Sequence, residues 1–205
     1  MLIKLTDTGD QTYNGTRWGE NVTHGPTSGQ GPLCSSGWLH FYEGLGVALF
    51  HNPNGAAFQT PHAWEARATV EKREGLKAGT RRLTTVRRVE YLPPTTEQLV
   101  TVAILLAFDV YDAEQDNGKW ATWAIDWLSG ADRTTAYATN AAYAASYAAH
   151  AAHAASYAPY AAYAASYAAA HAAHAAHAAY AAPYAANAAE WVKHADAVAC
   201  AVFGY

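Results

Sequence analysis

Cysteine is nearly missing from this sequence, and no stretch of it stays hydrophobic for long. The two cysteines, Cys34 and Cys200, are far apart and fit neither a zinc nor a redox spacing. We therefore expect no disulfide framework and a reduced, cytoplasmic setting. The longest apolar run, residues 99–108, is about half of a membrane span, and the first residues lack the pattern of a signal peptide. These absences predict a soluble chain without a membrane segment.

Strong net charge and the common catalytic motifs are also missing. The formal net charge is −4, which is too small to indicate nucleic acid or acidic partners. The sequence contains no P-loop, G-x-G-x-x-G, G-x-S-x-G or H-E-x-x-H motif. It therefore identifies no enzyme and predicts no cofactor. A role without catalysis is favoured, and an enzyme stays an alternative.

Residues 1–94 have the pattern of a small module with strands and a helix. A first strand is expected at 1–6, and the stretch 38–50 could be a strand that leads into a short helix. Residues 64–70 alternate between apolar and polar side chains, which is typical of a strand with one buried face. Residues 83–91 have the composition of a further strand. The two later strands predict an antiparallel hairpin in a sheet.

Residues 95–130 are predicted to form a linking pair of helices. Thr95 and Gln98 have the spacing of a capping box, in which each side chain binds the backbone N–H of the other residue. The first helix that follows is mostly apolar. The second has one apolar face, which carries Trp120, Ala124 and Trp127.

Residues 131–205 form the third part, which is saturated with alanine. Tyrosine, histidine or serine interrupts the alanines every three or four positions, and much of the pattern recurs after ten residues. Alanine is the strongest helix former, so helix is the expected state. Pro159 and Pro183 disfavour helix where they stand. We therefore predict closely packed helices near 133–157, 160–181 and 184–203, with one long, twice-kinked helix as the alternative.

These three parts together predict an α+β fold. A small module with an antiparallel sheet comes first, at residues 1–94. The linking helical pair follows at 95–130. The alanine-rich helical module, broken at Pro159 and Pro183, completes the chain at 131–205.

The most informative chemical feature is a run of basic residues between positions 67 and 88. Eight lysines and arginines stand there against Glu71 and Glu74, a local excess of six positive charges in an acidic chain. Arginine pairs bind phosphate bidentately, so this run indicates a phosphate-bearing ligand or partner. A solvated strand edge that deters aggregation is the alternative. The candidate ligand-binding residues are Arg67, Arg81, Arg82, Arg87 and Arg88, together with His40 and Tyr42.

Histidine and cysteine offer two further possibilities. His171, His174 and His177 stand three residues apart, so a pair of them could share a metal on a helix. Tyrosine occupies the same slots elsewhere in the repeat and no further ligand is near, so a spacer role is favoured and no metal is predicted. Cys34, with histidines nearby in the sequence, could be a nucleophile. It lacks a local signature, which favours a structural cysteine.

His40, Tyr42 and Glu43 are the residue types of the His–Tyr–Glu class of ADP-ribosyltransferases. In that family the three residues come from separate strands that are far apart in the sequence. Here they fall within four positions. The difference prevents a transfer of the family's catalytic roles to these positions.

Several segments carry a resemblance to another family. They are Trp18-Gly19-Glu20, Leu33-Cys34-Ser35-Ser36-Gly37, Asn52-Pro53, Trp64-Glu65-Ala66, residues 92–98, and Trp127-Leu128-Ser129-Gly130 with Asp132-Arg133 before the alanine repeats. Over nearly its whole length the chain resembles a family of uncharacterised bacteriophage and prophage proteins. The resemblance implies a phage origin and a place in the host bacterial cytoplasm. It implies no catalytic residues.

Three hypotheses about function follow. The leading one is a non-enzymatic phage accessory protein, including an anti-defence role, that sequesters a phosphate-bearing nucleotide-type small molecule or binds a host partner. The second is a structural scaffold, an oligomer or filament built by the alanine-rich helices. The third is an enzyme that acts on NAD or a nucleotide. We expect a homo-oligomer, with no membrane and no nucleic acid as partner.

Overall fold

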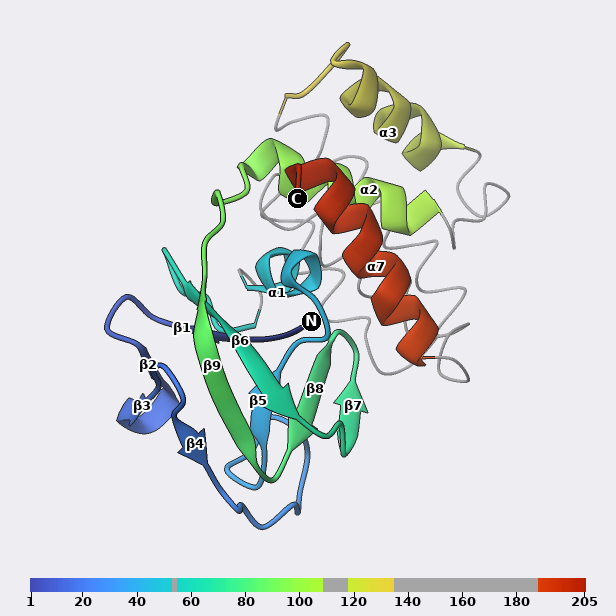
Figure 1. Ribbon diagram of the computed structural model, residues 1–205. Helices are drawn as coiled ribbons and strands as arrows, with labels where there is room; N and C mark the ends of the chain where they lie inside the picture. Colours follow the sequence, from blue (N-terminus) through green and yellow to red (C-terminus); the bar gives the residue numbers. More distant parts are fainter. Residues whose placement is uncertain (53–54, 109–117, 135–187) are drawn as a thin grey trace. The chain divides into compact units, whose positions relative to one another are not determined.

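The computed structural model describes residues 1–52, 55–108, 118–134 and 188–205. The chain forms two compact units (Figure 1). One contains Met1–Pro93 and Ala188–Tyr205, and the other is the intervening Pro94–Asn187. Antiparallel sheets together with helices confirm the α+β prediction at this level. The first unit is thus built from two segments that are far apart in the sequence.

Antiparallel strands make up most of the first unit. The larger sheet has the order β1 (Leu2–Thr6), β6 (His62–Ala68), β9 (Leu83–Val89) and β4 (Thr23–His24). A second sheet has the order β5 (Leu39–Phe41), β8 (Lys77–Thr80) and β7 (Lys72–Glu74). A smaller pair, β2 (Gln11–Thr12) and β3 (Thr16–Arg17), encloses the single turn η1 (Tyr13–Gly15). The predicted antiparallel pairing of β6 with β9 is confirmed, and the hairpin β7–β8 lies between them in the chain.

One pair of residues joins the two larger sheets. Ile3 in β1 and Tyr42, which directly follows β5, exchange two backbone hydrogen bonds of 2.8 Å each. Strand β1 is therefore next to β6 on one side and to the end of β5 on the other. The strands form a curled surface around a shared interior, as Figure 1 shows.

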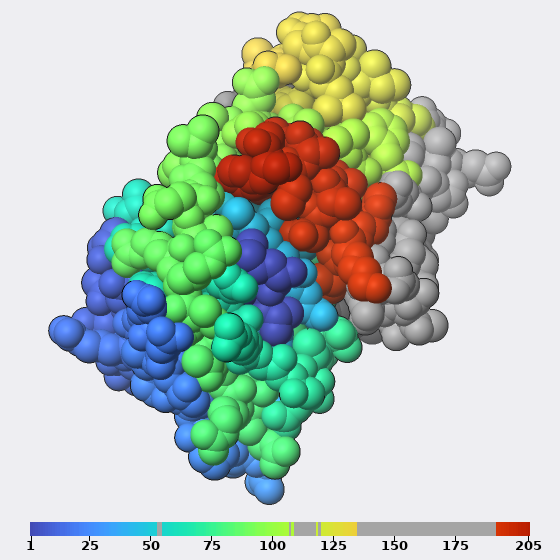
Figure 2. Space-filling view, in the orientation of Figure 1, coloured from blue at the N-terminus to red at the C-terminus, as the bar shows by residue number. Residues whose placement is uncertain are grey.

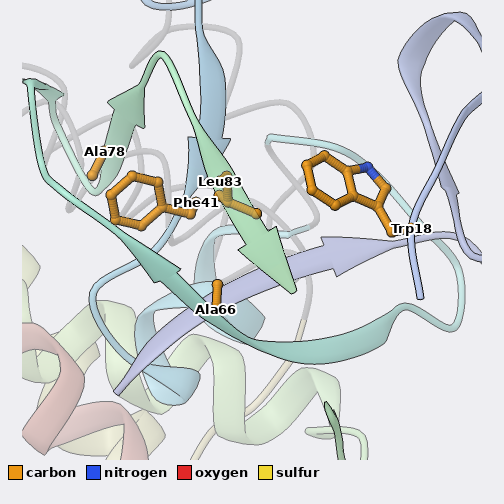
Figure 3. Close-up of a cluster of buried hydrophobic side chains, with 5 residues drawn as sticks. All are labelled: Trp18, Phe41, Ala66, Ala78 and Leu83. Atoms are coloured by element: carbon orange, nitrogen blue, oxygen red, sulfur yellow. The ribbon is translucent and has the colours of Figure 1, made fainter. Parts of the chain in front are cut away.

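The interior of this curled surface holds a cluster of apolar side chains. Trp18, Phe41, Ala66, Ala78 and Leu83 are all buried there and lie around one another in Figure 3. They come from both sheets and from the loop before β4. The period-two alternation in β6 and β9 supplies this cluster, because every second residue of a strand points to the same face.

Two helices pack against each other in the first unit. Helix α1 (Leu45–His51) contacts α7 (Ala188–Phe203), which lies on the outside of the unit (red in Figure 2). A Cβ at Gly46 would lie 2.8 Å from both the Cβ of Ala199 and the backbone oxygen of Asp196. The Asp196 side chain accepts a 3.0 Å hydrogen bond from the backbone N–H of Val47. It therefore caps α1 in place of Gly44, which has no side chain to do so.

The last helix of the alanine-rich part groups with the first unit. Composition assigned residues 131–205 to one helical module, whereas 188–205 belong to the first unit. The difference arises because α7 carries a buried face with the spacing of an amphipathic helix, made of Val192, Ala195, Ala199 and Phe203. The other predicted helices, near 133–157 and 160–181, lie outside the described residues, as do Pro159 and Pro183.

The second unit contains α2 (Thr96–Phe108) and α3 (Lys119–Ser129). The predicted capping box is confirmed, because Thr95 N donates to Gln98 Oε1 at 2.9 Å and Gln98 N to Thr95 Oγ1 at 3.2 Å. The buried rings of Trp120, Trp123 and Trp127 follow one another along α3. No helix among the described residues has the length and apolarity that crossing a membrane requires.

Candidate functional site

Three of the five predicted arginines form ion pairs on the surface. Arg81 contacts Glu71 at 2.6 Å, Arg87 contacts Glu65 at 2.7 Å, and Arg88 contacts Asp10 at 2.6 Å. Backbone and side-chain hydrogen bonds from Arg81 lower the pKa of Glu71. A carboxylate partner offsets most of an arginine's attraction for phosphate. These three arginines are therefore poor candidates for a phosphate site.

The other two arginines share one exposed face of the larger sheet. Arg67 in β6 stands directly opposite Thr84 in β9, and Thr84 stands opposite Thr23 in β4. Residues in such opposed positions point to the same face of a sheet. Arg82 is the residue before β9 and precedes Thr84 by two positions, so the alternation of β9, extended by one residue, would place it on the same face. Leu83, between Arg82 and Thr84, points into the core.

We call this surface the Arg67–Arg82 face; it consists of Arg67, Arg82, Thr23 and Thr84. Within the described part of the chain, neither guanidinium group has a carboxylate or hydrogen-bonding partner, and both residues are exposed; the hydrogen bonds of Arg82 with Thr80 involve its backbone. The hydroxyls of Thr23 and Thr84 are 2.7 Å apart. The face thus offers two uncommitted guanidinium groups beside hydroxyls, which are groups that bind phosphate oxygens.

Arg88 belongs to a separate network on the other face of the sheet. Its guanidinium carbon lies 5.1 Å from the ring centroid of Trp64, the residue opposite it in β6. His62 Nδ1 lies 2.8 Å from the same carboxylate oxygen of Asp10 that binds Arg88. Burial alone raises the pKa of Asp10, but the hydrogen bond with His62 and the charge of Arg88 outweigh it and hold that pKa below its usual value. The charged groups of this network are paired with one another, so the network needs no ligand to balance them.

His40 and Tyr42 lie in another part of the unit, away from the arginines. Both come from β5 or its end, and they occupy alternate positions that share a face. The His40 ring contacts the Leu33 carbonyl, and burial lowers the pKa of His40. The Tyr42 hydroxyl lies 3.2 Å from Nδ1 of His51, and burial raises the pKa of Tyr42. The structure therefore does not bring these two residues together with the arginines.

The residues of the His–Tyr–Glu comparison also have separate partners. Glu43 binds Arg73 through both of its carboxylate oxygens, at 2.7 and 3.0 Å. Tyr42 is bonded to a buried histidine and His40 to a backbone carbonyl. A transferase of that class would need its glutamate to activate a nucleophile, whereas Glu43 is held in a bidentate ion pair with Arg73.

Lys77 is a contact of Cys34 that sequence reasoning did not assign. Its Nζ lies 2.8 Å from the exposed sulfur of Cys34, although 43 positions separate them. The histidines near Cys34 in the sequence bind other groups, the Leu33 carbonyl in one case and Tyr42 in the other. Cys34 therefore forms a thiol–amine pair with Lys77 rather than a pair with either of these histidines.

Comparison with protein-family models, with curated proteins and with solved structures gives no match. The geometry of the described residues is therefore the basis for function. It offers the Arg67–Arg82 face for an anion and the Cys34–Lys77 pair for thiol chemistry. No cluster of three or more metal-ligating side chains occurs among the described residues, and His171, His174 and His177 lie outside them.

Proposed function

We propose that this protein is a non-catalytic binding protein whose Arg67–Arg82 face takes a phosphate-bearing ligand. The observation that carries the proposal is the contrast among the arginines of the basic run. Arg81, Arg87 and Arg88 each have a carboxylate within 2.7 Å, whereas Arg67 and Arg82 have none among the described residues. A guanidinium that keeps its full charge and all its donors binds phosphate most strongly.

The ligand class follows from the groups on this face. Guanidinium donors and threonine hydroxyls recognise phosphate oxygens rather than an apolar body. A nucleotide-type small molecule or a phosphate-bearing host partner would supply those oxygens. The resemblance to bacteriophage and prophage proteins supports a role in the host bacterial cytoplasm, where sequestering a nucleotide-derived signal would oppose host defence.

Titration calorimetry of the full chain against cyclic nucleotides and ADP-ribose derivatives tests this proposal. With a ligand that binds, the double variant Arg67→Gln/Arg82→Gln should weaken binding about 100-fold, because two charge-assisted hydrogen-bonding groups are lost. The matched control is Arg81→Gln/Arg87→Gln, which removes the same charge from paired arginines and should change affinity less than about threefold. Absence of heat with every ligand, or equal loss in both double variants, would overturn the proposal.

We also propose that the alanine-rich helices predicted near 133–157 and 160–181, turned at Pro159 and Pro183, join copies of the chain into a homo-oligomer. The supporting observation is topological. The first unit contains residues from both sides of this segment, so the repeat is an insertion rather than a free tail. Alanine faces allow close helix packing, and an insertion can change in length without disturbing the unit that holds its ends.

Light scattering on the full chain tests the second role. We expect a mass of at least two chains, and a monomeric mass for a variant in which a short Gly-Ser linker replaces residues 135–187. Tryptophan fluorescence of the shortened variant would check that the first unit stays folded. A monomeric full-length chain would exclude the scaffold.

A further inference from the structure

Cys34 and Lys77 place a thiol and an amine in direct contact on the surface of the first unit. Their Sγ and Nζ atoms are 2.8 Å apart. This is no longer than an ordinary N–H···O hydrogen bond, although sulfur is a larger atom than oxygen. A small movement along this line would bring the two atoms to bonding distance.

The residue before Cys34 fixes the position of the pair. Leu33 is fully buried over β8, where a Cβ at Gly79 would lie 2.2 Å from its Cδ1 atom. Its backbone N–H donates to Glu74 at 3.2 Å, and its carbonyl contacts the His40 ring. Cys34 is therefore attached to a residue that is held by packing on one side and by hydrogen bonds on both of its backbone groups. This arrangement keeps the thiol over Lys77.

Among the residues that the structure describes, no carboxylate competes for the Lys77 amine. Glu74 stands opposite Lys77 in the β7–β8 pairing, but its Oε2 atom accepts the Leu33 N–H. No carboxylate of the described residues forms an ion pair with Lys77. The described contact of its amine is the sulfur of Cys34.

We propose that Cys34 and Lys77 are a modification site, at which a peroxide closes a covalent S–N cross-link between the loop at 31–38 and β8. In the first step the sulfur attacks a peroxide oxygen, the O–O bond breaks, and Cys34 becomes a sulfenic acid with one water released. In the second step the Lys77 amine attacks that sulfur, the S–O bond breaks, and a second water leaves with one amine proton. Sulfur is oxidised, both peroxide oxygens are reduced to water, and the protein loses two hydrogens. A thiol reductant reverses the link.

This inference does not depend on the phosphate-binding role, because the pair joins the loop at 31–38 to β8 of the second sheet, whereas the Arg67–Arg82 face is on the larger sheet. Cys200 provides an internal control. It lies on α7 beside Asp196, at 3.9 Å, and burial raises the pKa of its thiol. A raised thiol pKa slows attack on peroxide, and a carboxylate cannot form an S–N bond.

Peptide mass spectrometry after peroxide treatment of the full chain at mildly alkaline pH tests the site. Trypsin should release residues 18–67 joined to residues 74–81, uncut after Lys77, at a mass about 2 Da below the sum of the two peptides. Treatment with dithiothreitol should separate them. Cys200 should remain a free thiol under the same conditions.

Two lysine variants serve as a matched pair. Lys77→Arg keeps the cation but carries a guanidinium that stays protonated, so the joined peptide should disappear. Lys72→Arg changes the neighbouring lysine, whose amine bonds to the Gly31 carbonyl, and should leave the yield within about twofold of the unmodified chain. A wild-type chain in which Cys34 stays unmodified, or is oxidised further while Lys77 stays free, would overturn the proposal. Formation of the link in Lys77→Arg would also overturn it.

Discussion

Replacing Gly46 with valine should lower the free energy of unfolding of the first unit by at least about 3 kcal/mol. The added Cβ would come within 2.8 Å of Ala199 Cβ, of the Asp196 carbonyl oxygen and of the Cys200 backbone nitrogen. Two of these three atoms are backbone, so no side-chain rotation can make room. The whole of α7 would have to move away from α1.

That movement would have two further costs. Asp196 would leave the N-terminus of α1, where its carboxylate binds the Val47 N–H, and the loss of such a cap costs about 1 kcal/mol. The buried side chains of Val192 and Phe203 would also be exposed to water, which forfeits their hydrophobic stabilisation. The substitution therefore tests whether the C-terminal helix holds the first unit together.

Urea denaturation followed by tryptophan fluorescence measures the effect. Gly19→Ala is the matched control, because its Cβ would meet its nearest neighbour, the Val22 side chain, at an ordinary 3.4 Å. It should change the free energy of unfolding by less than about 1 kcal/mol. A Gly46→Val protein as stable as the Gly19→Ala protein would show that α7 does not rest on this glycine.

The strands that could be predicted from the sequence are those whose pattern is local. In β6 the alternation of Trp64 and Ala66 with polar neighbours marks one buried face, and the structure places both side chains inside. The capping box of Thr95 and Gln98 was predictable for the same reason, because its two partners are three residues apart. Such features need no knowledge of the rest of the chain.

The hairpin β7–β8 and the docking of α7 could not be predicted in this way. Strand β7 is three charged residues, Lys72–Glu74, at the edge of its sheet, so no apolar alternation marks it. The face of α7 looked like a continuation of the alanine-rich repeat. Its role depends on Gly46, about 150 positions earlier, which provides the room for it.

The candidate site was predictable only as a set of residue types. The basic run indicated an anion-binding surface, but the pairing of each arginine depends on tertiary structure. Asp10 is 78 positions from Arg88, and Glu65 is 22 positions from Arg87. Among the described residues, these pairs leave the guanidinium groups of Arg67 and Arg82 without a carboxylate partner. The Cys34–Lys77 contact gave no sequence signal for the same reason.

Replacing Lys4 with methionine should stabilise the first unit at neutral pH by about 2 kcal/mol. Lys4 is buried, and burial lowers the pKa of its amine from 10.5 to about 8. Each unit of pKa shift corresponds to about 1.4 kcal/mol, so the charged amine costs the folded state about 3 kcal/mol below pH 8. The methionine variant would lose the hydrogen bond from Nζ to the His40 carbonyl, at 2.8 Å, and the contact with the Trp18 ring, which lowers the gain by about 1 kcal/mol.

The pH dependence gives the decisive measurement, and its sign follows from proton counts. Between pH 8 and 10.5 the unfolded chain holds a proton on Lys4 that the folded chain has released. Lys4 should therefore make the free energy of unfolding of the wild type rise with pH across this window relative to that of Lys4→Met. The control Lys72→Met, at a partly exposed lysine, should follow the wild-type curve. Wild-type and Lys4→Met curves that stay parallel between these pH values, or a Lys4→Met protein that is less stable at pH 7, would show that the buried amine does not carry this cost.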